Sequence, residues 1–157
     1  MNVRSLNHFN EVVFRPCVNP KTKKYDGDWW QLLVELSYLV DGEIWTIPVG
    51  YVTNFGSVPK VFRAFVDIND ESTLAFIFHD FGFGKDGFVI SLDDCNSALR
   101  QISEQHGQDW VERTLAYNAV KAFGWISFKS ELNNFANVDL SLIDKLCHDN
   151  NYYPEPV

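Results

Sequence analysis

The chain has few basic residues and no long apolar run. Only 13 of its 157 residues are Lys or Arg, against 21 that are Asp or Glu, and the formal net charge is −8. Because each phosphate contact needs a Lys or an Arg, we expect no nucleic-acid partner. No stretch approaches the roughly 18 apolar residues of a membrane-spanning helix. We therefore expect no membrane span, and the first residues lack the apolar segment of a secretion signal.

Cysteine motifs and the common catalytic motifs are also missing. Cys17, Cys95 and Cys147 lie far apart, are odd in number and include no C-x-x-C spacing. This pattern predicts neither a disulfide framework nor a thiolate zinc site, and it fits a reducing compartment. The chain also lacks a phosphate-binding loop, a G-x-S-x-G elbow and an H-E-x-x-H helix. The sequence leaves open whether the protein is an enzyme.

The first third of the chain has the pattern of β-strands. Residues 30–40 alternate with period two, which predicts one half-buried strand. Asp41 and Gly42 supply the positive φ angles of a tight hairpin, and residues 43–49 form the natural return strand. Residues 8–15 are predicted as a third strand, ended by the proline that follows. The core-facing side of the first strand comprises Leu32, Val34, Leu36, Tyr38 and Val40.

Helical patterns replace the strand pattern after Pro59. A short helix is predicted to begin at this proline, because proline fits the first turn of a helix. Residues 71–81 are apolar nearly all round, which is typical of a buried helix. A last helix is predicted over residues 139–147, before a short tail rich in proline.

Two further helices are indicated by their capping residues. Ser91 and Asp94 form an S-x-x-D box that opens one helix, and Gly107 closes it. Asp109 begins the next helix, which is predicted to end at Gly124.

The predicted fold class is α+β. We expect a small antiparallel β-sheet in the N-terminal third, packed on a helical half of three to five helices. Because no linker divides the chain, residues 1–157 are predicted to form a single domain. Within it, residues 1–58 are mainly β, residues 59–149 are mainly α, and residues 150–157 form an extended tail.

The stretch A-F-I-F-H-D-F-G-F-G places His79 and Asp80 inside an otherwise apolar run. If both are buried, both need partners, because an unpaired buried charge is strongly unfavourable. One reading is a metal or catalytic site in which Asp94, at the start of the next helix, approaches His79; zinc or manganese accepts such a set. The other is a neutral core histidine, a paired Asp80 and an Asp94 that only caps its helix. The residues alone leave both readings open.

The loop G-Y-V-T-N-F-G-S-V-P-K leads from the predicted strands into the helices. Thr53 and Ser57 carry short polar side chains that bond to nearby backbone, and Ser57 fits the cap of the helix that follows. Alternatively, the loop presents these hydroxyls to a ligand. We predict that Thr53 or Ser57 lies within hydrogen-bonding reach of His79 or Asp80.

These stretches, followed by D-D-C-N-S-A-L and A-Y-N-A-V-K-A-F-G, resemble a family of unknown function found in tailed bacteriophages and prophages. The family pattern is T-D-x-A-S-V-P-R, then H-D-x-x-Y, then an aspartate early in the next helix, and the match covers about residues 47–124. The resemblance places the family's polar positions at Thr53, Ser57, His79, Asp80 and Asp94. The chain departs from the pattern at Asn54, Gly56, Lys60 and Phe83. Losing a carboxylate and a phenol weakens the case for catalysis.

The resemblance implies a phage-encoded accessory protein. We expect it to be virion-associated at the tail or neck, or to work in the host bacterial cytoplasm during infection, through contacts with other phage or host proteins. The polar cluster would then hold the loop to the helix without any cofactor. Five tryptophans are available as core residues or as contact anchors: Trp29, Trp30, Trp45, Trp110 and Trp125.

Two alternatives remain open at this point. One is a small metal-dependent hydrolase of cell-wall peptide or amide bonds, with His79, Asp80 and Asp94 on zinc or manganese and with Thr53 and Ser57 as auxiliaries. The other is an acidic inhibitor of a host defence protein, since an acidic surface suits a basic partner. The sequence does not determine the oligomeric state.

Overall fold

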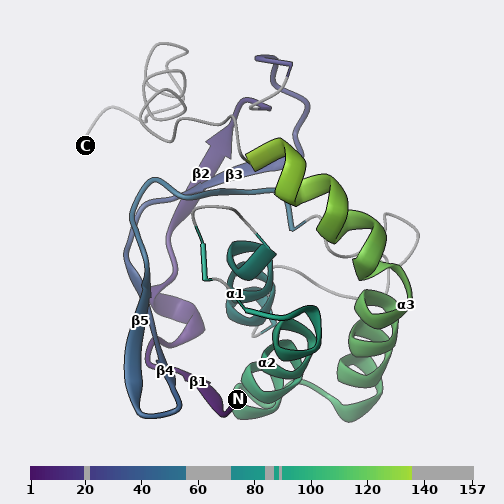
Figure 1. The fold of residues 1–157 in the computed structure, drawn as a ribbon. Helices are drawn as coiled ribbons and strands as arrows, with labels where there is room; N and C mark the ends of the chain where they lie inside the picture. The colour runs from purple at the N-terminus through teal and green to yellow at the C-terminus, as the bar shows by residue number, and fades with distance from the viewer. Residues whose placement is uncertain (20–21, 56–71, 84–86, 89, 136–157) are drawn as a thin grey trace.

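The computed structural model describes residues 1–19, 22–55, 72–83, 87–88 and 90–135, with side chains described up to residue 122. The fold is α+β, with small antiparallel sheets in the N-terminal part and helices in the C-terminal half (Figure 1). The predictions for Ser57, the helix from Pro59, the helix over 139–147 and the C-terminal tail lie outside the described residues.

One three-stranded antiparallel sheet contains the predicted hairpin. Its strands are β1 (Val3–Ser5), β4 (Leu36–Val40) and β5 (Glu43–Ile47), in the order β1-β4-β5. The turn between β4 and β5 has φ of 49° at Asp41 and 94° at Gly42. Positive φ at both positions is what a two-residue turn between twisted strands requires, so the hairpin prediction is confirmed.

The second three-stranded sheet lies beside the loop that leads into the helices. Its strands are β2 (Phe14–Cys17), β3 (Trp29–Leu32) and β6 (Val52–Thr53), in the order β2-β3-β6. Thr53, one of the predicted polar residues, pairs with Trp30 in this sheet. The short β6 therefore fixes the position of Thr53 relative to the sheet.

The predicted continuous strand over residues 30–40 is wrong, because the chain leaves one sheet after Leu32 and enters the other at Leu36. The predicted core face is nevertheless correct. Leu32, Leu36 and Tyr38 are all buried, and Val34 packs against the same core. A period of two is preserved across the break, so the alternation could not reveal it.

The predicted strand over residues 8–15 is also wrong in its bounds. Phe9–Glu11 forms a single 3-10 turn, in which the Glu11 side chain accepts from the His8 backbone N–H at 2.7 Å. The strand β2 begins only at Phe14, and it runs through Pro16 instead of stopping there. Because β2 is an edge strand, the missing N–H of proline needs no ladder partner.

The cysteines differ from one another in the structure. Cys17 is buried and disulfide-bonded, so the expectation that the chain would form no disulfide is wrong for this residue. Sequence spacing alone does not show which sulfur atoms the fold brings together. Cys95 is a free, buried thiol, and its burial raises its pKa to about 12.

Three helices follow the sheets in the described residues: α1 (Thr73–Phe83), α2 (Leu92–Gln105) and α3 (Trp110–Phe135). The Ser91 hydroxyl accepts from the Asp94 backbone N–H at 3.1 Å at the start of α2. Gly107 has a φ of 77° just beyond the end of α2. Both caps agree with the sequence prediction. Among the described helices, none is both long enough and apolar enough to cross a bilayer.

The predicted end of the third helix at Gly124 is wrong, since α3 continues to Phe135. A single glycine inside a helix lowers its stability by only about 1 kcal/mol relative to alanine. The residues that follow Gly124 include good helix formers such as Lys129, Glu131 and Leu132. Propensity over the longer stretch therefore outweighs the one glycine.

The core is organised around α1, which lies between the sheets and the other helices (Figure 1). Residues 74–79 on this helix have no exposed surface at all. The Tyr38 hydroxyl of β4 donates to the Leu74 carbonyl at 2.9 Å, and its ring lies 4.8 Å from the Phe78 ring. The buried helix predicted over residues 71–81 is confirmed with a shift of two residues.

Gly82 of α1 lies close to Cys95 of α2 and to Ile90 just before it. A Cβ placed on it would lie 2.9 Å from Sγ of Cys95 and 3.1 Å from Cδ1 of Ile90. We predict that Gly82→Ala lowers the free energy of unfolding by about 1–3 kcal/mol, because a methyl group has no room there. Chemical denaturation measures this change. Cys95→Ala in the same chain should recover part of the loss, and an unchanged stability for Gly82→Ala would contradict the close approach.

Candidate functional site

Thr53 and Asp80 join the end of β6 to the buried helix α1. The Thr53 hydroxyl donates to Oδ2 of Asp80 at 2.5 Å. The same hydroxyl accepts from the backbone N–H of Phe55 at 3.0 Å, which stabilises the positive φ of 51° at Phe55. Thr53 and Asp80 are both buried. The predicted contact between the loop and the His79-Asp80 pair is therefore confirmed through these two residues.

His79 is completely buried on α1 and contacts α2. Its Nε2 lies 3.0 Å from Oδ1 of Asn96, an arrangement in which a proton on Nε2 is donated to the amide oxygen. Burial lowers the pKa of His79 to about 4, and the hydrogen bond to Asn96 opposes this shift only in part. At neutral pH the imidazole is therefore neutral, as a core histidine must be.

Asp94, the third residue of the predicted metal set, makes its contacts elsewhere. Its Oδ2 accepts from the Ser91 hydroxyl at 2.7 Å, and its Oδ1 lies 3.8 Å from the N-terminal ammonium of Met1. Within the described residues, no three His, Cys, Asp or Glu side chains gather where they could hold a metal ion. The structure thus brings Thr53 to Asp80 and Asn96 to His79, and Asp94 caps α2.

Asn96 was not among the predicted site residues. It lies on the buried face of α2 and is 3% exposed. The sequence did contain a signal, because Asn96 stands one turn before the apolar Leu99 on the inward face of the helix. A polar residue at such a position needs a buried partner, but the sequence does not say which one.

A second pair of buried polar residues was also not predicted from the sequence. Arg15 of β2 and Gln31 of β3 are opposite each other in the sheet, and both are buried. Nε of Arg15 donates to Oε1 of Gln31 at 2.8 Å, and Nη2 donates to the same oxygen. The Gln31 amide reaches the Gly50 carbonyl at 3.4 Å. This pair fixes the sheet that carries Thr53.

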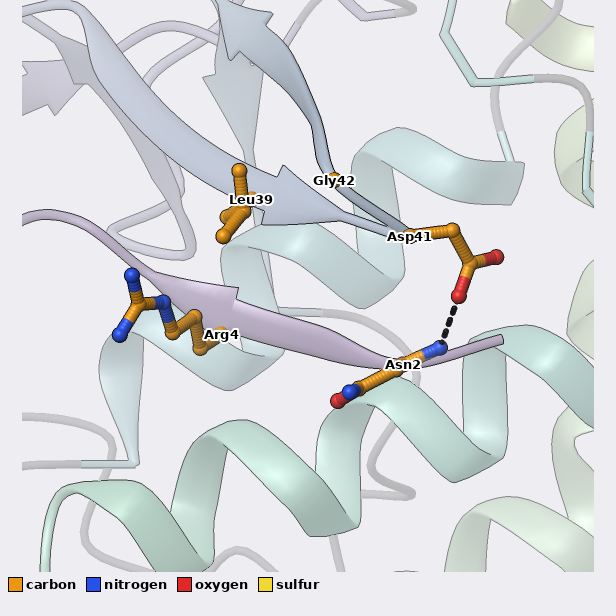
Figure 2. A pocket seen from close by; sticks show the side chains of 5 residues that line it. All are labelled: Asn2, Arg4, Leu39, Asp41 and Gly42. Carbon is orange, nitrogen blue, oxygen red and sulfur yellow. Dashed lines mark hydrogen bonds between the residues drawn. The ribbon is translucent and has the colours of Figure 1, made fainter.

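A shallow hollow of about 430 Å³ lies on the other sheet, near the turn between β4 and β5. Figure 2 shows Asn2 and Asp41 tied together there, with the Asn2 backbone N–H donating to Oδ1 of Asp41 at 2.7 Å. Arg4 and Leu39, which are paired across β1 and β4, complete the lining together with Gly42. None of these residues belongs to the polar cluster around α1.

Comparison with known families gives one match. The family model described as "Protein of unknown function (DUF1353)" covers residues 30–120, more than half of the chain. The matched range includes the sheet strand that carries Thr53, the helix that carries His79 and Asp80, and the α2 segment with Asn96. No curated protein and no solved structure shows a significant match.

The bond from Thr53 to Asp80 should contribute measurably to stability. We predict that Thr53→Val lowers the free energy of unfolding by about 1–3 kcal/mol, because the buried carboxylate loses a donor while the volume is kept. Thr53→Ser keeps the hydroxyl and should lose less. Urea denaturation of the two variants measures the difference. Equal losses would show that the methyl group, and not the hydroxyl, supports the fold.

The low pKa of His79 makes the stability depend on pH in a defined window. As the pH falls from about 6.5 to about 4, the imidazole of His79 binds a proton in the unfolded chain but stays neutral in the folded protein. The contribution of His79 to the free energy of unfolding is therefore fully present above about pH 6.5. It is lost on acidification toward pH 4, and the loss is on the order of 3 kcal/mol.

The variant His79→Gln tests this window. Its absolute stability should be lower, but its unfolding free energy should fall less steeply than that of the wild type in the same pH range. The exposed His8 supplies the matched control, since His8→Gln should leave the wild-type slope unchanged. Parallel pH profiles for the wild type and His79→Gln would contradict a buried neutral imidazole.

Proposed function

The chain belongs to the DUF1353 family of proteins of unknown function, and we propose that it is a phage-encoded accessory protein that works through protein contacts. The phage assignment is supported by the resemblance of the loop, H-D and helix motifs to a family of tailed phages and prophages. The contact function is supported by the surface of α3. In this proposal the polar pairs around α1 hold the fold together.

The observation that carries the proposal is a group of three exposed apolar residues in the first two turns of α3: Trp110, Val111 and Leu115. We call these three residues the α3 patch. Trp110 is 66% exposed, Val111 is 45% exposed and Leu115 is 44% exposed. The other tryptophans with described side chains are buried or half-buried: Trp29, Trp30 and Trp45.

An exposed tryptophan beside two exposed aliphatic residues is typical of a protein-binding surface. Residues 111 and 115 are one turn apart and face the same way, so both can contact a single partner. Tryptophan is enriched among the residues that dominate binding energy at interfaces, because it buries a large area with few rotamers to fix. The exposed Trp110 side chain contributes little to the stability of the fold, and it stands out on a chain whose net charge is −8.

The buried polar pairs support the same function in an indirect way. The hydroxyl of Thr53 is engaged by Asp80, and the Nε2 of His79 is engaged by Asn96. Each pair links a different element, β6 or α2, to α1. Their burial and pairing are the properties of a structural network, since buried polar groups are stable only when satisfied.

We further propose that the protein acts at the virion tail or neck, or in the host bacterial cytoplasm during infection. Mass spectrometry of purified particles from the phage or induced prophage that encodes the chain tests the location. Detection in amounts comparable to those of tail proteins would support a virion component. Its absence from particles, together with its presence in infected cells, would instead favour a contact with a host protein.

Substitution in the α3 patch should weaken binding without unfolding the protein. We predict that Trp110→Ser lowers particle incorporation, or affinity for the isolated partner, by about thirtyfold, which corresponds to a hot-spot loss of about 2 kcal/mol. Val49 is 60% exposed and lies outside the α3 patch, so Val49→Ser is the matched control and should bind as the wild type does. Thermal unfolding verifies that both variants fold.

The hydrolase alternative predicts a different outcome. Zinc or manganese would raise the melting temperature of the wild type and not that of His79→Ala, whatever residue stands at position 110. If metal raises the melting temperature in this way and Trp110→Ser binds as the wild type does, the contact proposal is wrong and the metal-dependent hydrolase is favoured.

A further inference from the structure

The two outer strands of the sheet β1-β4-β5 differ in what their outward-facing backbone groups bond to. On β1, glutamine side chains of α2 take the place of a neighbouring strand. Gln101 accepts from the Val3 N–H at 2.9 Å and donates to the Met1 carbonyl at 3.1 Å. Gln105 accepts from the Ser5 N–H at 2.7 Å and donates to the Ser5 carbonyl at 2.8 Å. The β1 edge is therefore closed by bonds within the chain.

Within the described residues, no strand or side chain closes the β5 edge. Because the turn has two residues, the pair that flanks it, Val40 and Glu43, is hydrogen-bonded, and so are the alternate pairs beyond it. The intervening residues of β5, Ile44 and Thr46, thus direct their backbone N–H and C=O groups away from β4. Figure 1 shows β5 as the outermost strand on the side remote from the helices, and Ile44 is 68% exposed.

The charged side chains on β4, β5 and the segments that flank them are all acidic, and the basic side chain of the same sheet, Arg4, lies two strands away from Ile44 on β1. Residues 33–49, which include β4, β5 and the turn, contain the acidic residues Glu35, Asp41 and Glu43 and no Lys or Arg. All three carboxylates are on exposed residues. An exposed edge strand often carries lysine or proline that discourages pairing. The five residues of β5 include neither, and a proline follows only at position 48.

We propose that β5 accepts an extended, positively charged segment of a partner protein as an additional strand. The free groups of Ile44 and Thr46 supply the main-chain hydrogen bonds, as in other cases of strand addition. Lys or Arg side chains of the segment lie beside Glu43, and the residues between them contact Ile44 on the opposite face. A second copy of the chain fits less well, because its own β5 would bring the same negative charges to the edge.

This inference names a partner chemistry for a protein that acts through contacts, so it rests in part on the proposed function. It concerns a different surface, however, since β5 and the α3 patch share no residue. Trp110→Ser should therefore leave binding at β5 unchanged, and failure of one proposal can be told from failure of the other.

The test uses short synthetic peptides and fluorescence anisotropy with the full chain. The first peptide alternates valine with lysine, and the control alternates valine with glutamate. We expect the lysine peptide to bind and the glutamate peptide to show no binding. Methylation of the backbone nitrogens of the lysine peptide then tests the hydrogen bonds. Because a strand bonds its neighbour only through alternate residues, methylation of one alternate set should abolish binding, and methylation of the other should not.

Two protein variants complete the test. Glu43→Lys, on an exposed side chain, should weaken binding about fivefold or more. Ile44→Pro removes the outward N–H without breaking the ladder to β4 and should also weaken binding about fivefold, whereas Thr46→Val should not. If Ile44→Pro does not fold, Glu43→Lys and the methylated peptides still test whether β5 binds the peptide as an added strand. Equal binding or no binding of the two peptides, equal effects of both methylation patterns, or self-association through β5 in sedimentation would each overturn the proposal.

Discussion

The removal of α1 from water is the constraint on which the rest of the structure depends. Six consecutive residues of this helix have no exposed surface, and they include His79 together with large aromatic side chains. A helix that is apolar all round must be covered on every side. The sheets, α2 and α3 supply that cover, and His79 and Asp80 then need partners from the elements that cover them.

Those partners come from two different elements of the fold. Asp80 accepts a hydrogen bond from the Thr53 hydroxyl of β6, and Nε2 of His79 donates one to the Asn96 amide oxygen of α2. Each bond connects α1 to a different neighbour, so the orientation of the helix is fixed by two directional contacts as well as by packing. Neutral His79 is stable in this setting because burial disfavours its charged form far more than Asn96 supports it.

The surfaces left to solvent are where contacts with other molecules can form. In the described residues, side chains of α2 close the edge of β1, whereas the edge of β5 has no neighbouring strand and Trp110, Val111 and Leu115 of α3 are exposed. The first surface offers unpaired backbone groups in an acidic setting, and the second offers an exposed tryptophan. Strand addition depends on hydrogen bonds and charge, whereas the α3 patch depends on apolar burial. The two surfaces therefore suit partners of different chemistry.

The sequence by itself determined the fold class, the turn at Asp41-Gly42, the start of α2 at Ser91 and its end near Gly107, because turns and caps depend on residues close together in the chain. It also determined which side of residues 30–40 faces the core. Only the tertiary structure decided that this run divides between two sheets and that α3 continues past Gly124. It likewise decided that Asn96, and not Asp94, meets His79. The reason is physical: local periodicity records which face of an element is buried, but the partner of a buried polar group depends on how remote elements pack.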